Sequence, residues 1–287
     1  MTQTYRNIAL IDGSNMLHRA WHMAKPRQRT SDGMEVGAIW LFSQMVAKMH
    51  RRMMSGKIPP SHIAIFFDPE HETTWRRKIY APYKADRPEM DAALVAQIPM
   101  MRDMCKAIGF GVGLCATHEA DDLIAAYAED AAACGGRATI ISTDKDLMQL
   151  VRPGVLQYHP MMDKFFTQAE VEKKFEVGPD MLGDFLALAG DKSDGVPGAP
   201  GVGPKTAVAL LKQFGSLESL LARSSEIEKP GWRKKIEEND EMIRLSRKLV
   251  ALDDEGAPRV IEPADMISSS EQEVAVRMDE WRSNFAT

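Results

Sequence analysis

Nine acidic residues fall at the ends of expected strands and helices. They are Asp12, Asp68, Glu119, Asp121, Asp122, Asp144, Asp146, Asp191 and Asp194. Packed together, such like charges repel one another unless cations neutralise them. A ligand set made of carboxylate oxygens suits hard cations, so we expect two or more Mg²⁺ ions, for which Mn²⁺ should substitute. Two such ions a few ångströms apart can hydrolyse a phosphodiester, because one activates water and the other stabilises the leaving oxygen.

A structural role is the alternative for each acid taken alone. Aspartate is common before Gly or Pro in turns and near helix starts as a cap, which favours this role for Asp68 or Asp194 alone. The run Glu119-Ala-Asp-Asp alone fits the acidic first turn of a helix. Asp144 and Asp146 are more specific, since two acids flanking one residue just after a strand point the same way. All nine arising as caps is much less expected than one shared site.

The elements that must position these acids alternate along the first 150 residues. Short apolar runs at 8–11, 63–67 and 138–142 predict buried strands, and each stops at or just before an acid. Residues 38–54, 91–108 and 121–133 have helical patterns. This alternation predicts an α/β fold with a mostly parallel sheet flanked by helices. Because sites in such sheets form at the carboxyl ends of the strands, the acids should converge on one edge.

After about residue 180 the pattern becomes all-helical, with helices expected near 206–211, 216–222, 232–252 and 271–281. The segment 190–205, which contains GVPGAPGVGPK, is too rich in Gly and Pro to be helical. It is not a phosphate-binding P-loop, because Pro204 separates Gly203 from Lys205 and no strand precedes it. It fits a helix-hairpin-helix that contacts DNA phosphates through backbone amides, without sequence information. A plain connection between helices is the alternative, and Lys212, Lys234 and Lys235 either extend the phosphate track or are simply solvated.

The segment 75–87 combines five basic residues with three aromatic residues and one acid. Cations interleaved with rings suit single-stranded nucleic acid, because phosphates bind the cations and bases stack on the rings. The alternative is a solvated amphipathic helix whose rings lie in the core. Its position directly after the strand that ends at Asp68 favours the nucleic-acid interpretation.

Composition narrows the class of protein. The chain has 287 residues, is 44% hydrophobic and carries a formal net charge of −5, which fits a globular protein. Its apolar runs are too short to span a bilayer, and its N-terminus lacks the pattern of a secretory signal. Three scattered cysteines predict neither a disulfide set nor a zinc site, so we expect a cytoplasmic protein without a membrane partner. Setting the nine acids aside leaves 36 basic against 32 acidic residues, a mildly basic surface of +4.

In order, the motifs IDGSN, FFD, WRRKIYAPYKADR, EADD, TDKDLMQL, GDKSDGVPG and GVGPKTA resemble the 5′-nuclease family. That family includes the N-terminal domain of bacterial DNA polymerase I, phage 5′-exonucleases and flap endonucleases. The resemblance covers about residues 8–250. It implies a PIN-like nuclease domain at 1–180 with a helical arch at about 72–105, a helix-three-turn-helix domain at 181–262 and a helical tail at 263–287. Since no polymerase domain follows Thr287, a free-standing, monomeric nuclease is expected.

The resemblance also implies roles for single residues. Asp12, Asp68, Glu119 and Asp121 would hold one Mg²⁺, and Asp144, Asp146 and Asp191 the other, while Asp122 and Asp194 would act through water. The arch residues Arg76, Lys84 and Arg87 would hold the scissile phosphate, with Arg77 and Tyr83 near the entering strand. At the hairpin, Gly201, Gly203, Lys205 and Thr206 would grip the duplex and bind K⁺. The substrate would be branched, nicked or gapped DNA with a single-stranded 5′ end, cut by 5′-3′ exonuclease or flap endonuclease activity.

Two departures concern duplex binding only: Gly195 stands where many members have Asn, and Pro204 where many have a charged residue. Three other functions compete with the nuclease. A non-cleaving scaffold for branched DNA would have no use for nine acids. A PIN-type ribonuclease would lack the hairpin module, and a phosphatase acting on small phosphoesters would not need the arch.

Overall fold

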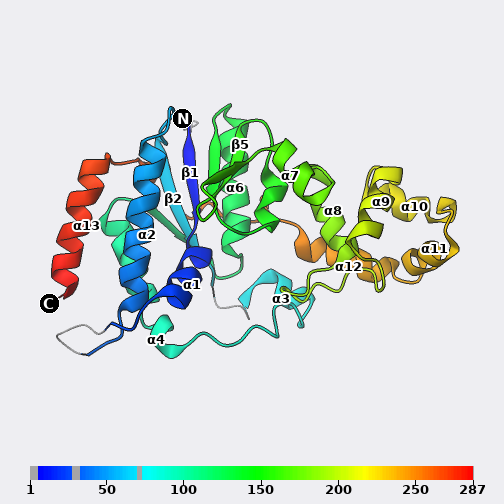
Figure 1. Cartoon of the computed structure of the whole chain (residues 1–287), viewed down its shortest axis with the longest axis horizontal. Coiled ribbons are helices and arrows are strands. Elements are labelled where there is room, and N and C mark those ends of the chain that lie inside the picture. Colours follow the sequence, from blue (N-terminus) through cyan, green and yellow to red (C-terminus); the bar gives the residue numbers. More distant parts are fainter. Residues whose placement is uncertain (1–5, 28–32, 70–72, 287) are drawn as a thin grey trace.

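A six-stranded sheet forms the centre of the larger part of the molecule (Figure 1). The computed structural model describes residues 6–27, 33–69 and 73–286. The strand order is β3-β2-β1-β4-β5-β6, in which β1 to β5 are parallel and β6 is antiparallel. The strands are β1 (Ile8–Asp12), β2 (His62–Phe67), β3 (Gly111–Leu114), β4 (Ala138–Ile141), β5 (Val155–His159) and β6 (Lys164–Phe166). The expected α/β fold with a mostly parallel sheet is confirmed.

Helices cover both faces of the sheet, and successive side chains of β2 point alternately to one face and the other. Ile63, Ile65 and Phe67 point to the face covered by α1 (Gly13–Met23), α2 (Gly37–Met54), α5 (Ile98–Ala107) and α13 (Glu271–Ala286). Phe66 points to the opposite face, where α6 (Ala120–Ala133) packs and Tyr127 lies 5.2 Å from its ring. Since successive residues of a strand alternate between faces, one apolar run supplies both cores.

The second part of the molecule is helical and extends to one side of the sheet (Figure 1). It contains α7 (Gln168–Phe175), α8 (Pro179–Ala189), α9 (Pro204–Phe214), α10 (Leu217–Ala222), α11 (Pro230–Glu237) and α12 (Asp240–Val250). Leu186, Leu210 and Ile243 are buried in its core, which also takes in Met148 and Phe166 from the sheet side. The helical part therefore packs continuously on the sheet, and a boundary at residue 180 stays a prediction.

The sequence prediction missed three strands and divided two helical regions wrongly. The strands β3, β5 and β6 are short, and β3 contains Gly111 and Gly113, which weaken a strand pattern. The expected helix 91–108 is two helices, α4 (Ala92–Val95) and α5, because Pro99 favours a new helix start. The expected helix 232–252 is divided into α11 and α12 at Asn239, whose side chain donates to the carbonyl of Lys235 over 2.7 Å.

The segment expected as an arch is helical only in part. It contains α3 (Trp75–Ile79), α4 and most of α5, and turns and extended chain connect α3 to α4. Short 3₁₀ helices in the described part of the chain include η2 (Asp146–Leu150), η3 (Ser224–Glu226) and η4 (Pro263–Met266). The expected C-terminal helix is confirmed as α13, which packs on α2 and α5. None of the described helices combines the length and apolar character needed to cross a membrane.

Candidate active site

The carboxyl end of β1 carries the first acid of the site. Asp12 ends the strand and caps α1, since its carboxylate accepts from the amide of Asn15 at 2.9 Å and from the hydroxyl of Ser142 at 2.6 Å. The next residue is glycine because a Cβ there would lie 2.7 Å from the carbonyl oxygen of Phe66. Burial, with a smaller contribution from the charges of Asp68 and Asp144, raises the pKa of Asp12 to about 7, although the two hydrogen bonds lower it.

Neighbouring strand and helix ends bring three more acids beside Asp12. The carboxylate of Asp68, just after β2, accepts from the amide of Ala120 at 2.7 Å and so joins the end of β2 to the start of α6. The amide of Asp144, just after β4, donates to the same Ser142 hydroxyl at 2.9 Å. Burial raises the pKa of Asp121 well above its usual value, and the charges of Asp144 and Asp12 add to the effect. The predicted convergence at one sheet edge is therefore observed.

Asp146 opens η2 and completes this unneutralised group. Its amide donates to the carboxylate of Asp144 at 2.9 Å, which folds the two acids onto one side of the loop. Its own Oδ1 is buried without a hydrogen-bond partner among the described residues, and the Nζ of Lys145 lies 3.6 Å away. Burial, followed by the charge of Asp144, raises the pKa of Asp146 to about 7. A buried carboxylate oxygen that accepts no hydrogen bond is suited to binding a metal cation.

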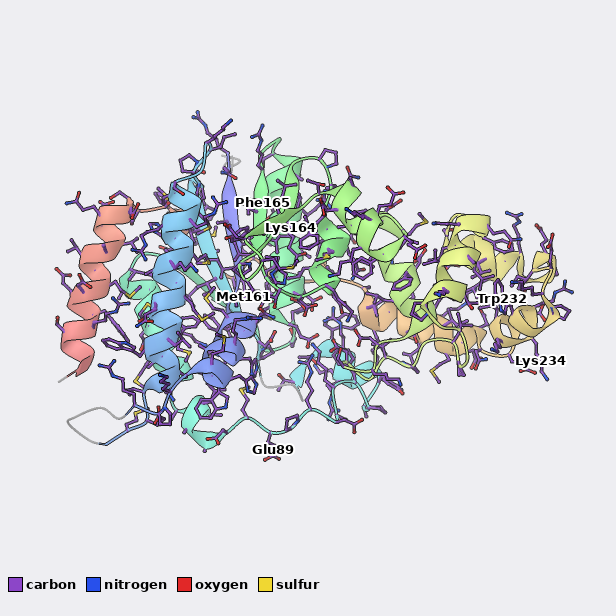
Figure 2. The ribbon with its side chains drawn as sticks, in the orientation of Figure 1. Glu89, Met161, Lys164, Phe165, Trp232 and Lys234 are labelled. Atoms are coloured by element: carbon purple, nitrogen blue, oxygen red, sulfur yellow. The ribbon has the colours of Figure 1, made fainter. Side chains whose placement is uncertain are left out.

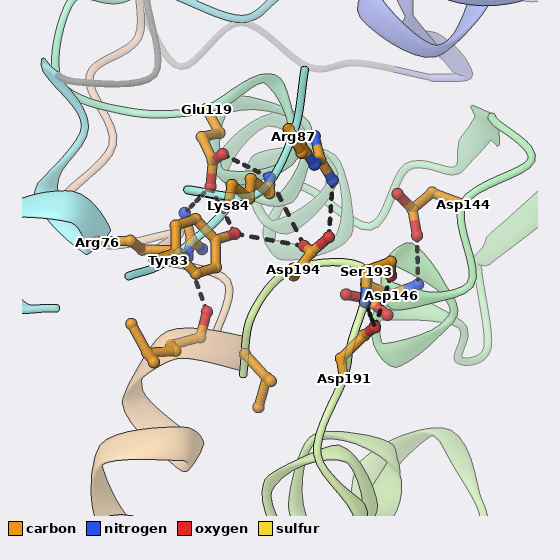
Figure 3. Close-up of polar contacts among 12 residues, drawn as sticks. Arg76, Tyr83, Lys84, Arg87, Glu119, Asp144, Asp146, Asp191, Ser193 and Asp194 are labelled. Atoms are coloured by element: carbon orange, nitrogen blue, oxygen red, sulfur yellow. Dashed lines mark hydrogen bonds and ion pairs between the residues drawn. The ribbon is translucent and has the colours of Figure 1, made fainter. Parts of the chain in front are cut away.

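A second group of acids is neutralised by the protein's own cations, and Glu119 lies at its centre (Figure 3). Its carboxylate accepts from Lys84 at 2.6 Å, Arg76 at 2.8 Å and the hydroxyl of Tyr83 at 3.1 Å. Burial alone would raise the pKa of Glu119, but Lys84 and Arg76 hold it at about 2. Burial alone would lower the pKa of Lys84, and Glu119 instead raises it well above its usual value. The pair is therefore fully charged.

Arg76 is committed to the protein itself. Its guanidinium binds both oxygens of Asp122 at 2.6 and 2.7 Å, reaches Glu119, and donates to the carbonyls of Leu249 and Ala251 at 2.9 and 2.6 Å. These five bonds match the five N–H donors of arginine, so none is left for a phosphate. Asp122 is fully buried and faces Arg76 rather than the unneutralised acids. This arrangement favours a structural role for Arg76 and Asp122. The phosphate contact predicted for Arg76 and the water-mediated metal contact predicted for Asp122 would each require these bonds to change.

The last two acids come from the loop after α8. Asp191 is bound by Lys145 and by the amide and hydroxyl of Ser193 at 2.8 and 2.5 Å. Burial would raise the pKa of Asp191, yet Lys145 and Ser193 lower it. Asp194 accepts from Arg87 at 2.6 Å and lies 3.7 Å from Lys84. This loop therefore joins the helical part to the segment that carries Lys84 and Arg87.

A small cavity shows how closely this segment lies over the acids. Its volume is about 10 Å³, and Glu119, Asp121, Asp146 and Asp194 line it together with Tyr83. That space holds about one water molecule. Across the described residues, no three His, Cys, Asp or Glu side chains are already arranged about one metal position. The donor chemistry and the Asp146 oxygen without a hydrogen bond fit a hard divalent cation such as Mg²⁺.

The predicted hairpin residues lie in the helical part, away from the acids (Figure 1). Gly201 has a φ of +78°, which favours glycine, and its carbonyl accepts from Lys235 at 2.7 Å. Gly203 precedes α9, which starts at Pro204; a proline in the first turn is compatible with a helix. Lys205 is exposed there and Thr206 follows it. DNA and K⁺ binding at these residues stay predictions.

The Gly195 departure has a local explanation. Its φ is +68°, and a Cβ would lie 2.9 Å from the carbonyl oxygen of Pro82. The loop therefore touches the arch segment directly, as the 2.9 Å bond from the amide of Lys84 to the carbonyl of Asp194 also shows. Arg77 lies on the same segment and donates to the carbonyl of Tyr83 at 3.1 Å. Sequence reasoning missed Ser142, Lys145 and Ser193, although Lys145 stands between two of the predicted ligands.

Comparisons with known proteins give this geometry a family. Residues 7–176 match the family model "5'-3' exonuclease, N-terminal resolvase-like domain", and residues 177–273 match "5'-3' exonuclease, C-terminal SAM fold". The chain belongs to the 5′-3′ exonuclease family. Both the sheet edge with its acids and the helical part fall within these matches, so the predicted family is confirmed. The C-terminal helix α13 lies largely beyond them.

Among relatives of this exonuclease family, the "5'-3' exonuclease" of Aquifex aeolicus is 39% identical over 86% of this chain and 82% of its own length. "Flap endonuclease Xni" of Shewanella sediminis is 34% identical over 85% of this chain and 90% of its own. "DNA polymerase I" of Rhizobium leguminosarum is 41% identical over 86% of this chain, but the match spans 24% of that longer protein.

Solved structures of the same fold include the bacteriophage T5 D15 protein co-crystallised with metal ions. It superposes with a TM-score of 0.71 at 17% identity and covers 98% of this chain and 100% of that one. Human GEN1 in complex with Holliday junction DNA superposes with a TM-score of 0.53 at 16% identity, covering 99% of this chain and 70% of that one. At these identities the likeness concerns the fold.

Proposed function

We propose that this member of the 5′-3′ exonuclease family hydrolyses DNA phosphodiesters near the 5′ ends of flaps, nicks or gaps. The observation that carries the proposal is the unneutralised group of Asp12, Asp121, Asp144 and Asp146 at one sheet edge. Beside it lies a basic, aromatic segment suited to a nucleic-acid strand. Relatives named 5'-3' exonuclease and flap endonuclease support the choice of reaction.

The unneutralised group, together with Asp68, would hold Mg²⁺ or Mn²⁺. When bound, such ions supply an activated water and charge stabilisation of the leaving oxygen. The protein's part is to fix the ligands: Ser142 orients Asp12, and the amide of Asp146 orients Asp144. Asp191 could join these metal ligands if Lys145 releases its carboxylate. Arg76 positions Glu119 from behind and does not touch the substrate.

Lys84 and Arg87 would bind the phosphate, because both lie over the acids and both can exchange carboxylate partners for phosphate oxygens. Lys84 now holds Glu119 and Arg87 holds Asp194. A strand cannot enter the 10 Å³ cavity in this arrangement. A strand that binds between this segment and Glu119 would have to displace residues 80–91, which would expose Tyr83 for stacking on a base. The exposed Lys205 and the amides at the start of α9 would hold the downstream duplex through its phosphates.

The deciding experiment uses a 5′-flap duplex labelled on the flap. We expect a short labelled product in Mg²⁺, none in EDTA, and none from Asp144→Ala, which should still bind the flap. Asp103→Asn, an exposed acid on α5, is the matched control and should cleave normally. A flap that is retarded on a gel but never cut would support the scaffold instead. An RNA flap cut faster than a DNA flap of the same sequence would support a ribonuclease, and hydrolysis of p-nitrophenyl phosphate would support a phosphatase.

A further inference from the structure

A groove runs along α2 on the face of the sheet that carries α1, and it begins at the active site. Two cavities form it. The one next to Asp12 has a volume of about 190 Å³, and the one at the opposite edge of the sheet, next to Asn7, has a volume of about 660 Å³. Arg52 lines both. Since Asn7 and Asp12 are five strand residues apart, the groove is roughly 17 Å long.

The two cavities share one floor and the same two walls, which the pair of Arg52 with Asp163 bridges. Register places Ala9, Thr139 and Leu156 in one row across β1, β4 and β5, and these residues lie under the larger cavity. Ile141 and Tyr158 lie two residues further along the same face, under the smaller cavity. One wall is a single stripe of α2 at helical spacing, formed by Met45, Lys48, Met49, Arg52 and Met53. The opposite wall is the β5–β6 hairpin with Met161 and Phe165, which Figure 2 labels.

The charge of this groove is opposite to that of the protein as a whole. Six basic residues line it, whereas the acids among its described lining residues are Asp12, which belongs to the active site, and Asp163. The basic residues are Arg19, Lys48, Arg52, Lys57, Arg137 and Arg152. The formal net charge of the chain is −5, so composition alone does not explain such a concentration.

Most of this positive charge is available to a ligand. The pairs of Arg52 with Asp163 and of Arg152 with Glu129 are exposed at both ends, and such pairs contribute little to stability. Among the described residues, Lys57 and Arg137 form no ion pair. The Nε of Arg19 is buried without a hydrogen-bond partner in the described part of the chain. A series of phosphates could therefore bind along the groove at small cost.

We propose that the groove binds the single-stranded 5′ arm of the DNA after the strand has passed the acids, an inference that rests on the proposed function. Figure 1 shows the helical part, which would hold the duplex, and α2 on opposite sides of the sheet. A strand leaving that duplex and crossing the acids arrives at Asp12, where the groove begins. Phosphates would meet the six cations, and a base would lie on Phe165, which is 42% exposed and covers the buried ring of Tyr158. At duplex spacing, an arm of about five nucleotides reaches the far end.

The test compares 5′ arms of two and eight nucleotides on one duplex, bound in EDTA so that no cleavage occurs. The wild-type protein should bind the longer arm more tightly. The double variant Lys57→Gln/Arg137→Gln should lose much of this preference, because two of the six cations are gone, and should cut the two-nucleotide arm at the wild-type rate in Mg²⁺. For the longer arm, loss of two phosphate contacts lowers the slope of log affinity against log salt by about 1.4. The control Lys106→Gln/Lys173→Gln removes two exposed cations outside the groove and should match the wild type.

A photoreactive base about five nucleotides into the arm gives an independent measure. It should cross-link to peptides containing residues 52–58 or 137–139, and cross-linking confined to residues 75–87 or to the helical part would overturn the groove assignment. A double variant that keeps the wild-type preference for long arms in a protein that cleaves flaps would also overturn it, while leaving the proposed function intact. Preference for long arms without any cleavage would support the groove and overturn the proposed function.

Discussion

The acids of the site divide into two groups that the same protein treats in opposite ways. Glu119, Asp122, Asp191 and Asp194 are each held by a lysine or arginine of the chain itself. For Asp12, Asp121 and Asp146, burial and the neighbouring acids raise the pKa instead. Burying carboxylates beside one another is costly, so a chain that keeps three or more of them together is prepared for a cation from outside.

The neutralised group does different work. Arg76 joins α3 to the start of α6 and to the end of α12, through Asp122 and two backbone carbonyls. Lys84 and Arg87 hold the segment of residues 80–91 down on Glu119 and Asp194. One group therefore determines the metal chemistry and the other determines where the surrounding elements lie. Substitutions in the two groups should fail in different ways.

The largest effect should come from Asp146→Asn in the unneutralised group. Losing a metal ligand removes several kcal/mol of transition-state stabilisation, so cleavage of a flap should fall about 10³-fold or more. DNA affinity measured in EDTA should change little, because the loss is confined to metal chemistry. Single-turnover rates at saturating protein measure this effect. Asp103→Asn is the matched control, and a variant that keeps a tenth of the wild-type rate would contradict the grouping.

Arg76→Met tests the neutralised group. It leaves two buried carboxylates and two carbonyls without their donor, and breaking a buried pair in this way costs about 3–5 kcal/mol. Urea unfolding should show this loss in the free energy of unfolding. Lys78→Met, on the same helix but exposed, should change it by less than about 0.5 kcal/mol. Equal stability of the two variants would mean that Arg76 does not organise the site.

Asp146→Asn should have the opposite effect on stability when no metal is present. Replacing a buried carboxylate that lies among like charges by a neutral amide removes both penalties, so the variant in EDTA should be more stable by at least about 1 kcal/mol. Adding Mg²⁺ should raise the melting temperature of the wild type more than that of the variant. Thermal melts with and without Mg²⁺ measure both effects. Destabilisation in EDTA would show that this acid is already satisfied within the protein.

The sequence predicted well that acids meet at one sheet edge, for a physical reason. Strands of a parallel sheet end at one edge, so acids that directly follow three apolar runs must meet there. The same reasoning could not predict which acid pairs with which lysine or arginine. That Arg76 faces Asp122 rather than solvent depends on how α3 packs against α6 and α12, which are separated by more than forty residues at the nearest. Local pattern carries no information on such contacts.

The fold shows the same division between local and distant causes. Long periodic segments such as α2, α6 and α13 were predictable, because their apolar faces repeat within each helix. The strands β3, β5 and β6 were missed because none is a continuous apolar run of four or more residues: glycines interrupt β3, Gln157 interrupts β5, and β6 has three residues. The groove along α2 was also beyond the sequence. Arg19 comes from α1 and Lys57 and Arg137 from two separate loops, and only the folded sheet brings them to one face.

The smallest expected effect concerns Tyr83, which links the arch segment to the neutralised group. Its buried hydroxyl donates to Glu119 at 3.1 Å, and a hydrogen bond to a charged acceptor contributes about 1.5–3 kcal/mol at most. Glu119 keeps Lys84 and Arg76 when this bond is lost, so we expect Tyr83→Phe to destabilise the protein by only about 1 kcal/mol. If lifting of the segment limits the reaction, the variant should also release it more readily and raise the rate on short flaps. Tyr80→Phe, one turn earlier, is the control, and unchanged stability of Tyr83→Phe would show that the ion pairs alone hold the segment down.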